Sequence, residues 1–424
     1  MKRKLTIFVL IYLFFSTNLY ADISLLERNA LIDFYNSTEG TNWTNQTNWL
    51  GSPGTECEWY GITCSNNHIT KIYLYENNLS GSIPKSIGNL SNLESINLIH
   101  NQLTGTIPKE FCNLINLKEL ELGDSYGGGY NQLTGTIPEE LGNLINLEKL
   151  KLGNNMTGII PPELGNLSNL KSLILRGNQI SGNIPSELSN LTNLEIVVLE
   201  NTQLTGSIPS WLGSLTNLKY LYLANNHTGT IPVELGNLSN LKVLCMRQNQ
   251  LTGVIPPELG NLTNLEQLRL HSNMLTGSIP SELCNLINLK ILYMHYNQIS
   301  GAIPLSIGNL TQLEKINLSN NELQGYIPSE FVNLLNLIDN ESDFRNNALC
   351  TPTSTLLNFI NSKQIDGDWI SSQDIKFDIR DAINILQIIA EINPEEINLI
   401  CDINGDNKIG IEEAIYALMT VSKN

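Results

Sequence analysis

Asn261 to Leu283 reads NLTNLEQLRLHSNMLTGSIPSEL, and this stretch decides the fold. The asparagine at its centre recurs in steps of 24 residues, at Asn77 and Asn101 and again at Asn249, Asn273, Asn297 and Asn321. Around each of these asparagines the chain repeats the pattern L-x-x-L-x-L-x-x-N-x-L-x-G-x-I-P-x-x-L-G-N-L. A fixed period of this length predicts a solenoid of stacked structural units.

Each part of the repeat has a physical role, because one unit alone cannot bury its own leucines. Leu268 and Leu270 alternate with polar residues, which predicts a short strand with one buried face. The asparagine that follows can donate and accept hydrogen bonds, so a row of stacked asparagines would satisfy backbone groups at the bend. Gly277 tolerates a positive φ, and Pro280 lies where no ladder N–H is needed. Strands on one side and wider structure on the other predict a curved solenoid with a concave strand face.

The L-x-G-x-I-P and L-G-N-L elements resemble the plant-type leucine-rich repeat, as in receptor-kinase ectodomains and secreted polygalacturonase-inhibiting proteins. The resemblance covers about Ile69 to Asn336, in which eleven units fit, and a degenerate twelfth unit follows at Phe344 to Leu349. It implies an α/β repeat solenoid, a right-handed horseshoe with a concave parallel β-sheet. We therefore assign residues 69–349 to the repeats.

Three units depart from the 24-residue period. One unit gains six residues, 125–130, which predicts a bulge at the edge of the concave face. Two others lose a residue, which puts Met156 and His227 where leucine normally packs. We expect His227 to be a tolerated, partly exposed substitution.

The N-terminus begins with Lys2, Arg3 and Lys4, an apolar run and Ala21, which predicts a secretory signal over residues 1–21. Residues 22–68 would cover the open end of the solenoid, with Leu25, Leu26, Leu31 and Phe34 at nearly helical spacing. Within them CEWYGITC resembles the N-terminal cap of plant repeat proteins, and this resemblance implies a disulfide between Cys57 and Cys64.

The net charge and the number of cysteines further limit the possible partners and disulfides. The formal charge of −17 makes nucleic acid a poor partner. The chain has seven cysteines, so at least one lacks an intramolecular mate. Cys112 and Cys284 replace the glycine of L-G-N-L and are read as small buried residues. Cys350 is either free or bridged to Cys401.

Residues 350–369 resemble the C-terminal helical cap of bacterial repeat proteins. Residues 370–424 change character, with apolar helices expected at 379–390 and 411–422, in matching register 32 residues apart. Before the second helix, DINGDNKIGIEE places hard oxygen ligands at the spacing of a calcium loop: Asp402, Asn404, Asp406, the Lys408 carbonyl and Glu413.

This pair of helices resembles a dockerin-type EF-hand module, which implies a bound Ca²⁺, a bacterial source and a cohesin-like or cell-surface docking partner. The corresponding first loop, from Ile370 through Ser372, Asp374, Lys376 and Asp378 to Asp381, lacks its first ligand. We expect one calcium ion per chain, at the second loop. At the positions through which dockerins read cohesin this chain has Ile411 and Glu412, which puts cohesin binding in doubt.

Ligand binding in a solenoid falls to the variable positions of the concave strands. Aromatic and cationic residues gather there on four adjacent units, and we call these eight the concave patch: Tyr220, Tyr222, Arg247, Arg269, His271, Tyr293, His295 and Tyr296. Tyrosine and arginine dominate interface energetics, and aromatic faces also stack on sugars. The competing explanation is drift on an exposed surface. Glu119, Glu121 and Asp124 form a weaker acidic patch.

Catalysis is the alternative to ligand binding as the function of this surface. His271 and His295 on neighbouring strands, with Cys245 one strand away, could be written as a metal site or a Cys–His pair. A zinc site needs more ligands and a nucleophile needs an orienting group, so we expect no enzymatic activity.

The sequence thus predicts a secreted or cell-surface monomer that recognises an extracellular protein or polysaccharide. The alternative function is inhibition of an extracellular glycan-degrading enzyme.

Overall fold

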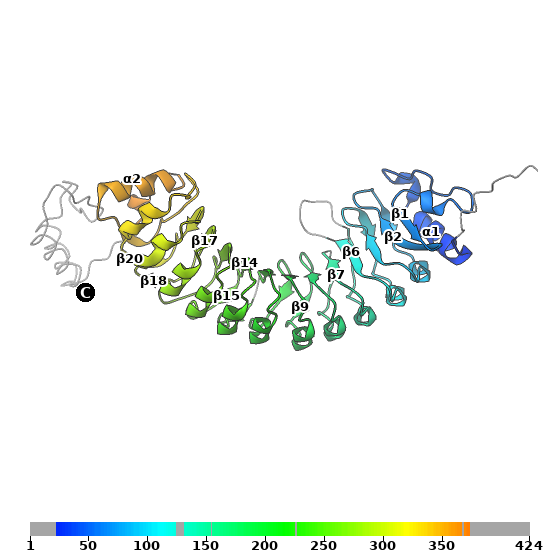
Figure 1. The fold of residues 1–424 in the computed structure, drawn as a ribbon, viewed down its shortest axis with the longest axis horizontal. Helices are drawn as coiled ribbons and strands as arrows, with labels where there is room; N and C mark the ends of the chain where they lie inside the picture. Colours follow the sequence, from blue (N-terminus) through cyan, green and yellow to red (C-terminus); the bar gives the residue numbers. More distant parts are fainter. Residues whose placement is uncertain (1–22, 124–130, 154, 225–226, 367–368, 374–424) are drawn as a thin grey trace, which may run out of the picture.

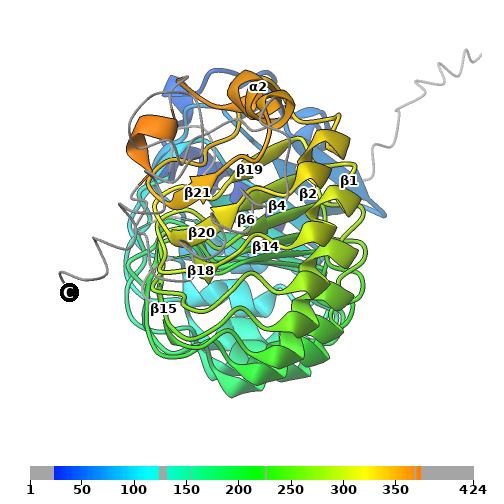
Figure 2. The ribbon, with the colours of Figure 1, turned by 90° about the vertical axis from the view of Figure 1, so that its left-hand side faces the viewer.

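The fold was analysed in a computed structural model that describes residues 23–123, 131–153, 155–224, 227–366 and 369–373. The repeats form an open arc with helix α1 near one end and helix α2 near the other (Figure 1). Strands of one long sheet line the inner side of this arc, and short helical turns line the outer side (Figures 1 and 2).

The predicted long parallel sheet is confirmed. Among the described residues it has 12 strands in chain order, all parallel except for the antiparallel pair β1 and β2. Its strands are β1 (Ile62–Ser65), β2 (His68–Tyr73), β4 (Ser95–Asn97), β6 (Glu119–Gly123), β7 (Lys149–Leu152), β8 (Ser172–Ile174), β10 (Ile196–Val198), β12 (Tyr220–Tyr222), β14 (Val243–Cys245), β16 (Gln267–Arg269), β17 (Ile291–Tyr293) and β19 (Lys315–Asn317). Leu268 and Leu270 are fully buried, as the alternation predicts.

The asparagine ladder exists as predicted. Asn249 donates from Nδ2 to the carbonyls of Leu223 (2.6 Å) and Met246 (2.9 Å), and its Oδ1 accepts from the N–H of His227 (3.0 Å). Asn273 repeats this pattern one unit later. Each such side chain therefore ties its own coil to the preceding one, using backbone groups that the bend would leave unpaired. At Thr202 the hydroxyl replaces the amide and bonds only within its own coil.

After the ladder the chain turns through glycines with positive φ. Gly277 has φ +73°, and a Cβ there would lie 2.8 Å from Val254 Cγ1, so the position is closed to larger residues. Short strands lie along the side of the arc, and most of them contain one of these glycines or come shortly before it: β3 (Ser80–Ser82), β5 (Gln102–Thr104), β9 (Ser181–Gly182), β11 (Gln203–Leu204), β13 (Thr228–Gly229), β15 (Gln250–Leu251), β18 (Ser300–Gly301), β20 (Glu322–Tyr326) and β21 (Ala348–Cys350).

The outer side consists of 3₁₀ turns that begin after the proline of I-P: η3 (Lys85–Asn89), η4 (Lys109–Asn113), η5 (Glu139–Asn143), η6 (Pro162–Asn166), η7 (Ser186–Asn190), η8 (Ser210–Ser214), η9 (Val233–Asn237), η10 (Pro257–Asn261), η11 (Ser281–Asn285), η12 (Leu305–Asn309) and η13 (Ser329–Asn333). A Cβ at Gly260 would lie 2.3 Å from the carbonyl oxygen of Glu282 in the next turn. The tight approach explains the small residue of L-G-N-L. Cys284 is buried at this position, as expected, whereas Cys112 is only half-buried.

The N-terminal cap contains α1 (Leu25–Ser37), η1 (Gly40–Asn42) and η2 (Glu56–Glu58). Helix α1 confirms the helix that the spacing predicts, with Leu31 and Phe34 buried, but Leu25 and Leu26 are exposed and do not cover the open end of the solenoid. The buried residue of that first turn is instead Glu27, which closes a capping box with Ser24 and accepts the Ile69 N–H (3.1 Å). The predicted disulfide between Cys57 and Cys64 is present.

The C-terminal cap contains α2 (Ser354–Lys363) and η14 (Ile370–Ser372). Trp369 is fully buried, and Gln373 bonds to the carbonyls of Phe344 (3.1 Å) and Trp369 (3.0 Å). Residues 370–373 are therefore attached to the last repeat. Across the described residues, we find no helix that combines the length and apolarity needed to span a membrane.

His227 is fully buried, which corrects the expectation of a partly exposed side chain. Its Nδ1 lies 3.4 Å from the Gly206 carbonyl oxygen, and its Nε2 has no hydrogen-bond partner among the described residues. Burial lowers the pKa of this imidazole, although the contact with Gly206 opposes the shift. Met156, at the same place in the other shortened unit, is equally buried.

Replacing Asn249 by leucine should destabilise the solenoid by about 1–3 kcal/mol, because two carbonyls and one N–H of the buried bend lose their partner. Urea unfolding measures the difference. Asn264→Leu is the matched control, since Asn264 is exposed and donates a single bond, to the Ser239 carbonyl. Equal stability of Asn249→Leu and the wild type would contradict a structural role for the buried row.

Replacing His227 by methionine should make the stability of the solenoid less sensitive to acid. The folded-state pKa of His227 lies below its ordinary value, so the unfolded chain takes up the proton first and stability falls as pH drops below about 6.5. The difference in free energy of unfolding between His227→Met and the wild type should therefore shift in favour of the variant as pH is lowered below about 6.5. The shift is at most about 1.4 kcal/mol per pH unit and ends when the pH reaches the folded-state pKa of His227. Unfolding at several pH values measures it, with Met156→Leu as control. A pH-independent advantage would mean that protonation of His227 does not matter.

Candidate ligand-binding surface

The register of the long sheet places the predicted residues in rows across neighbouring strands. Tyr222 pairs with Cys245, Cys245 with Arg269, Arg269 with Tyr293, and Tyr293 with Asn317. Side chains two residues further along each strand project from the same face. His271 and His295 therefore lie beside each other, next to the row that contains Arg269 and Tyr293.

Five residues of the concave patch form one cluster, which we call the ring cluster: Arg269, His271, Tyr293, His295 and Tyr296. The imidazoles of His271 and His295 are stacked, with centroids 4.4 Å apart and an interplanar angle of 10°. Tyr293 meets both edge-on, at 6.0 and 5.7 Å. The guanidinium of Arg269 lies 5.7 Å from the centre of the Tyr293 ring, which is cation–π distance.

The two histidines of the ring cluster are neutral near pH 7. Burial, followed by the charges of His295, Arg247 and Arg269, lowers the pKa of His271 to about 3. Burial also lowers the pKa of His295, although Asp343 opposes the shift. Both Nδ1 atoms are buried without a hydrogen-bond partner among the described residues. The cluster therefore combines uncharged rings with the single positive charge of Arg269.

Tyr296 has a strained backbone. Its φ of +54° is unusual for a bulky residue and costs on the order of 1–3 kcal/mol. Its side chain is 58% exposed, and its ring meets His295 edge-on at 5.6 Å. The same positive φ occurs before other residues of the ladder, as at Gln248, Ser272 and Asn320, so the strain belongs to the bend of the repeat. What distinguishes Tyr296 is the exposed ring that it adds to the cluster.

Arg247 turns away from the ring cluster. Its guanidinium is 3.5 Å from Glu200, which is buried and also pairs with Arg176 at 3.1 Å. This pairing could not be predicted from the repeat pattern, because Glu200 and Arg247 are two units apart. Arg247 thus belongs to a charge network on the concave face.

Tyr220 and Tyr222 lie on β12, on the far side of β14 from the ring cluster. On β14, which lies between these tyrosines and the ring cluster, the side chains of Val243 and Cys245 are buried and apolar, so they do not project far from the sheet. The eight predicted residues are therefore arranged as a ring cluster, a charge network and a separate tyrosine pair.

A hollow of about 410 Å³ adjoins the ring cluster at the C-terminal end of the sheet. Besides His295 and Tyr296, it is lined by Asn317, Ser319, Asn320, Asp343, Arg345 and Asn346. Arg345 holds Asp343 with two bonds of 2.9 Å. Burial would raise the pKa of Asp343, but the bonds from Arg345 and Gln364 outweigh it and keep the pKa below its usual range. Sequence reasoning missed Asp343 and Arg345 because they lie at the start of the degenerate twelfth unit, Asp343 directly before it and Arg345 within it.

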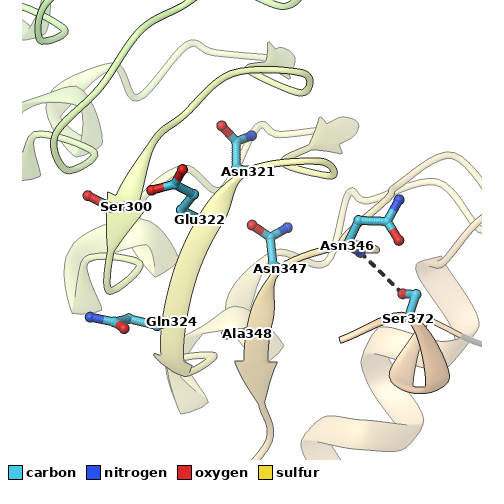
Figure 3. A pocket seen from close by; sticks show the side chains of 8 residues that line it. All are labelled: Ser300, Asn321, Glu322, Gln324, Asn346, Asn347, Ala348 and Ser372. Carbon is cyan, nitrogen blue, oxygen red and sulfur yellow. Dashed lines mark hydrogen bonds between the residues drawn. The ribbon is translucent and has the colours of Figure 1, made fainter. Parts of the chain in front are cut away.

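A second hollow, of about 550 Å³, opens on the side of the arc (Figure 3). It is lined by Ser300, Asn321, Glu322, Gln324, Asn346, Asn347, Ala348 and Ser372, of which the Asn346 N–H donates to Ser372 Oγ (Figure 3). Asn346 borders both hollows. Amides and hydroxyls dominate the lining, which suits hydrogen bonding to a polar ligand.

The arrangement does not assemble a recognisable catalytic set. Burial raises the pKa of the Cys245 thiol, the opposite of what a nucleophilic cysteine needs. Within the described ranges, no group of three or more histidine, cysteine or acidic side chains could hold a metal ion. The calcium ligands predicted at Asp402, Asn404, Asp406, Lys408 and Glu413, with Cys401 and Asp124, lie outside the described residues.

Family comparisons match most of the repeat region. Residues 67–125 match the family described as leucine rich repeat, and residues 128–247 match a leucine-rich repeat region. Single leucine-rich repeats match at 240–262, 264–286, 288–310 and 312–334.

Several solved structures with the same fold are plant receptors. An Arabidopsis receptor kinase, HAESA, in complex with the peptide hormone IDA and the co-receptor SERK1, is 31% identical over 77% of this chain and 54% of its own, with a TM-score of 0.67. The PEPR1–AtPEP1 complex is 28% identical over 80% of this chain and 54% of its own, with a TM-score of 0.63. A plant ice-binding protein is 25% identical over 78% of this chain and 96% of its own, with a TM-score of 0.56.

Among curated proteins, the Arabidopsis thaliana leucine-rich repeat receptor protein kinase EMS1 is 34% identical over 90 residues, which is 21% of this chain and 7% of that protein. The chain thus covers a small part of such curated relatives and about half of the receptor structures. Residues 67–334 form a plant-type leucine-rich repeat domain that resembles the ectodomains of receptor kinases.

Proposed function

We propose that the protein is a secreted or cell-surface, non-enzymatic recognition protein that binds an extracellular protein or polysaccharide on its concave face. The observation that carries this proposal is the ring cluster. Arg269, two stacked neutral histidines and two tyrosines form a contiguous surface on adjacent strands, beside a hollow of about 410 Å³.

The chemistry of the ring cluster suits a ligand with a flat group and an anionic or strongly polar group. The neutral histidines and Tyr293 offer ring edges and faces, and Arg269 offers the charge. Aromatic and arginine side chains of this kind contribute most of the binding energy in many interfaces. The related HAESA structure contains the peptide hormone IDA, which favours an extended protein segment as the ligand here.

The ligand can be sought by capture from culture supernatant and cell envelope, using the whole chain as bait. Capture of a glycan-degrading hydrolase, with loss of its activity on binding, would favour the alternative function of an inhibitor.

Once a ligand is captured, Arg269→Ala combined with Tyr293→Ala should weaken its binding by about 2 kcal/mol or more, because the cation–π pair and the ring contacts are lost together. Calorimetry of the purified pair measures this. Thr252→Ala is the control, since Thr252 is exposed near β15 on the side of the arc. Unchanged affinity in a correctly folded double variant would reject the ring cluster as the binding site.

We also propose that residues 370–424 contain a calcium-binding docking module of the dockerin type, with the ion at the loop from Asp402 to Glu413. The support is the spacing of its oxygen ligands. In the first loop, the Ser372 hydroxyl already donates to the Trp369 carbonyl oxygen (2.5 Å) and accepts from Asn346, so it is engaged in the cap.

Calorimetry on the whole chain should find one bound calcium ion. Asp402→Ala with Glu413→Ala should abolish the binding heat, because a carboxylate is lost at each end of the loop. Asp374→Ala with Asp378→Ala, in the first loop, should leave the heat unchanged. No calcium heat in the wild type, or an unaltered heat in the Asp402 and Glu413 variant, would refute the site.

A further inference from the structure

The opposite end of the concave face has an aromatic pair that the concave patch does not include. Tyr73, the last residue of β2, is 59% exposed, and Tyr75, two residues on, is 39% exposed. Their rings are nearly parallel, with centroids 6.5 Å apart and an interplanar angle of 28°. His100 meets the Tyr75 ring edge-on at 5.1 Å and so helps to hold it in place. The two rings form a tyrosine platform.

The platform is remote from the ring cluster. From β2 to β17 there are nine steps between adjacent strands in the sheet order, and each step is about 4.8 Å, so the path along the sheet is roughly 43 Å. In Figure 1, β2 and β17 lie on opposite arms of the arc. A ligand at the tyrosine platform therefore makes contacts that are separate from those at Arg269 and Tyr293.

Charges around the platform are balanced. Glu94 pairs with Lys118 (2.8 Å), Glu119 with Lys149 (2.6 Å) and Glu121 with Lys151 (3.4 Å). The remaining charged neighbours on β2 and in the turn after it are Lys71 and Glu76, of opposite sign. This end of the face therefore presents no net charge that would select an anionic ligand.

A cationic ligand is also disfavoured. Lys71 lies two residues before Tyr73 in β2, so it projects from the same face of the strand. A guanidinium or ammonium group placed over the Tyr73 ring would meet this like charge, which opposes the cation–π attraction. An uncharged ligand with one flat apolar face avoids this repulsion.

We propose that Tyr73 and Tyr75 form a binding subsite for neutral sugar rings of an extracellular glycan. The axial C–H groups of a pyranose give the ring an apolar face that stacks on an aromatic side chain, while its hydroxyls keep their hydrogen bonds at the edge. Two nearly parallel rings on an exposed surface supply such a face. The subsite is independent of the ligand proposed for the ring cluster.

The test uses the whole chain and three neutral probes, cellohexaose, xylohexaose and mannohexaose, with binding followed by calorimetry and saturation-transfer NMR. At least one probe should bind. Tyr73→Ala with Tyr75→Ala should weaken that binding about tenfold or more, which corresponds to about 1.4 kcal/mol. Tyr73→Phe with Tyr75→Phe should retain most of it, because stacking depends on the ring face rather than on the hydroxyl.

The variant Arg269→Ala with Tyr293→Ala separates this proposal from the function proposed above: loss of glycan binding in that variant, with full binding by Tyr73→Ala with Tyr75→Ala, would place the glycan at the ring cluster and overturn the subsite. Thr252→Ala, on the side of the arc, is the control that should leave glycan binding unchanged. Failure of all three probes to bind the folded wild type would overturn the subsite. Equal binding by the double alanine variant at Tyr73 and Tyr75 would overturn it too.

Discussion

The buried amide of the inner asparagines is the interaction on which the solenoid depends. A single repeat buries no leucine by itself, so the fold exists only if each coil is fixed at the right height on the one before. Asn249 does this with three bonds, two to carbonyls and one from an N–H, in a bend where ladder bonding has ended. Once that spacing is fixed, the strands pair, the leucines stack, and the glycine turns can approach to within contact distance.

Much of this was predictable because periodicity repeats the same physical demand in every unit. Leu268 is buried, Gly277 has a positive φ, and Cys57 is bonded to Cys64, all as expected from the motif and the cap resemblance. The failures occur where a position has no repeat to constrain it. Leu25 and Leu26 are exposed because a buried Glu27 caps the first helical turn and accepts from the first repeat. His227 is buried because its coil is fixed by its neighbours, whatever side chain fills the position.

The rows of side chains on the candidate binding surface could be predicted from the sequence, but the contacts between those side chains could not. Period-2 alternation correctly brings His271 and His295 side by side, and their stacking follows from strand spacing. That Arg247 faces Glu200 could not be inferred, because side-chain reach across two units depends on the actual curvature. Asp343 and Arg345 were missed because the twelfth unit has lost the pattern that marks concave positions. The electrostatic contrast along the face also emerged only from geometry, with paired charges near Tyr73 and an arginine over a ring at Tyr293.

The strands and outer turns of each described repeat pack against those of the next repeat, so the molecule can deform elastically along its whole length. A small rotation at each junction of the 12-stranded sheet adds to the next, so the two arms of the arc separate or approach through many small changes rather than at one hinge (Figure 1). No single junction has to break a bond for the opening to widen. A ligand that touched β2 and β17 together would set the curvature of the whole arc. Its affinity would therefore change with any force applied to the ends of the arc.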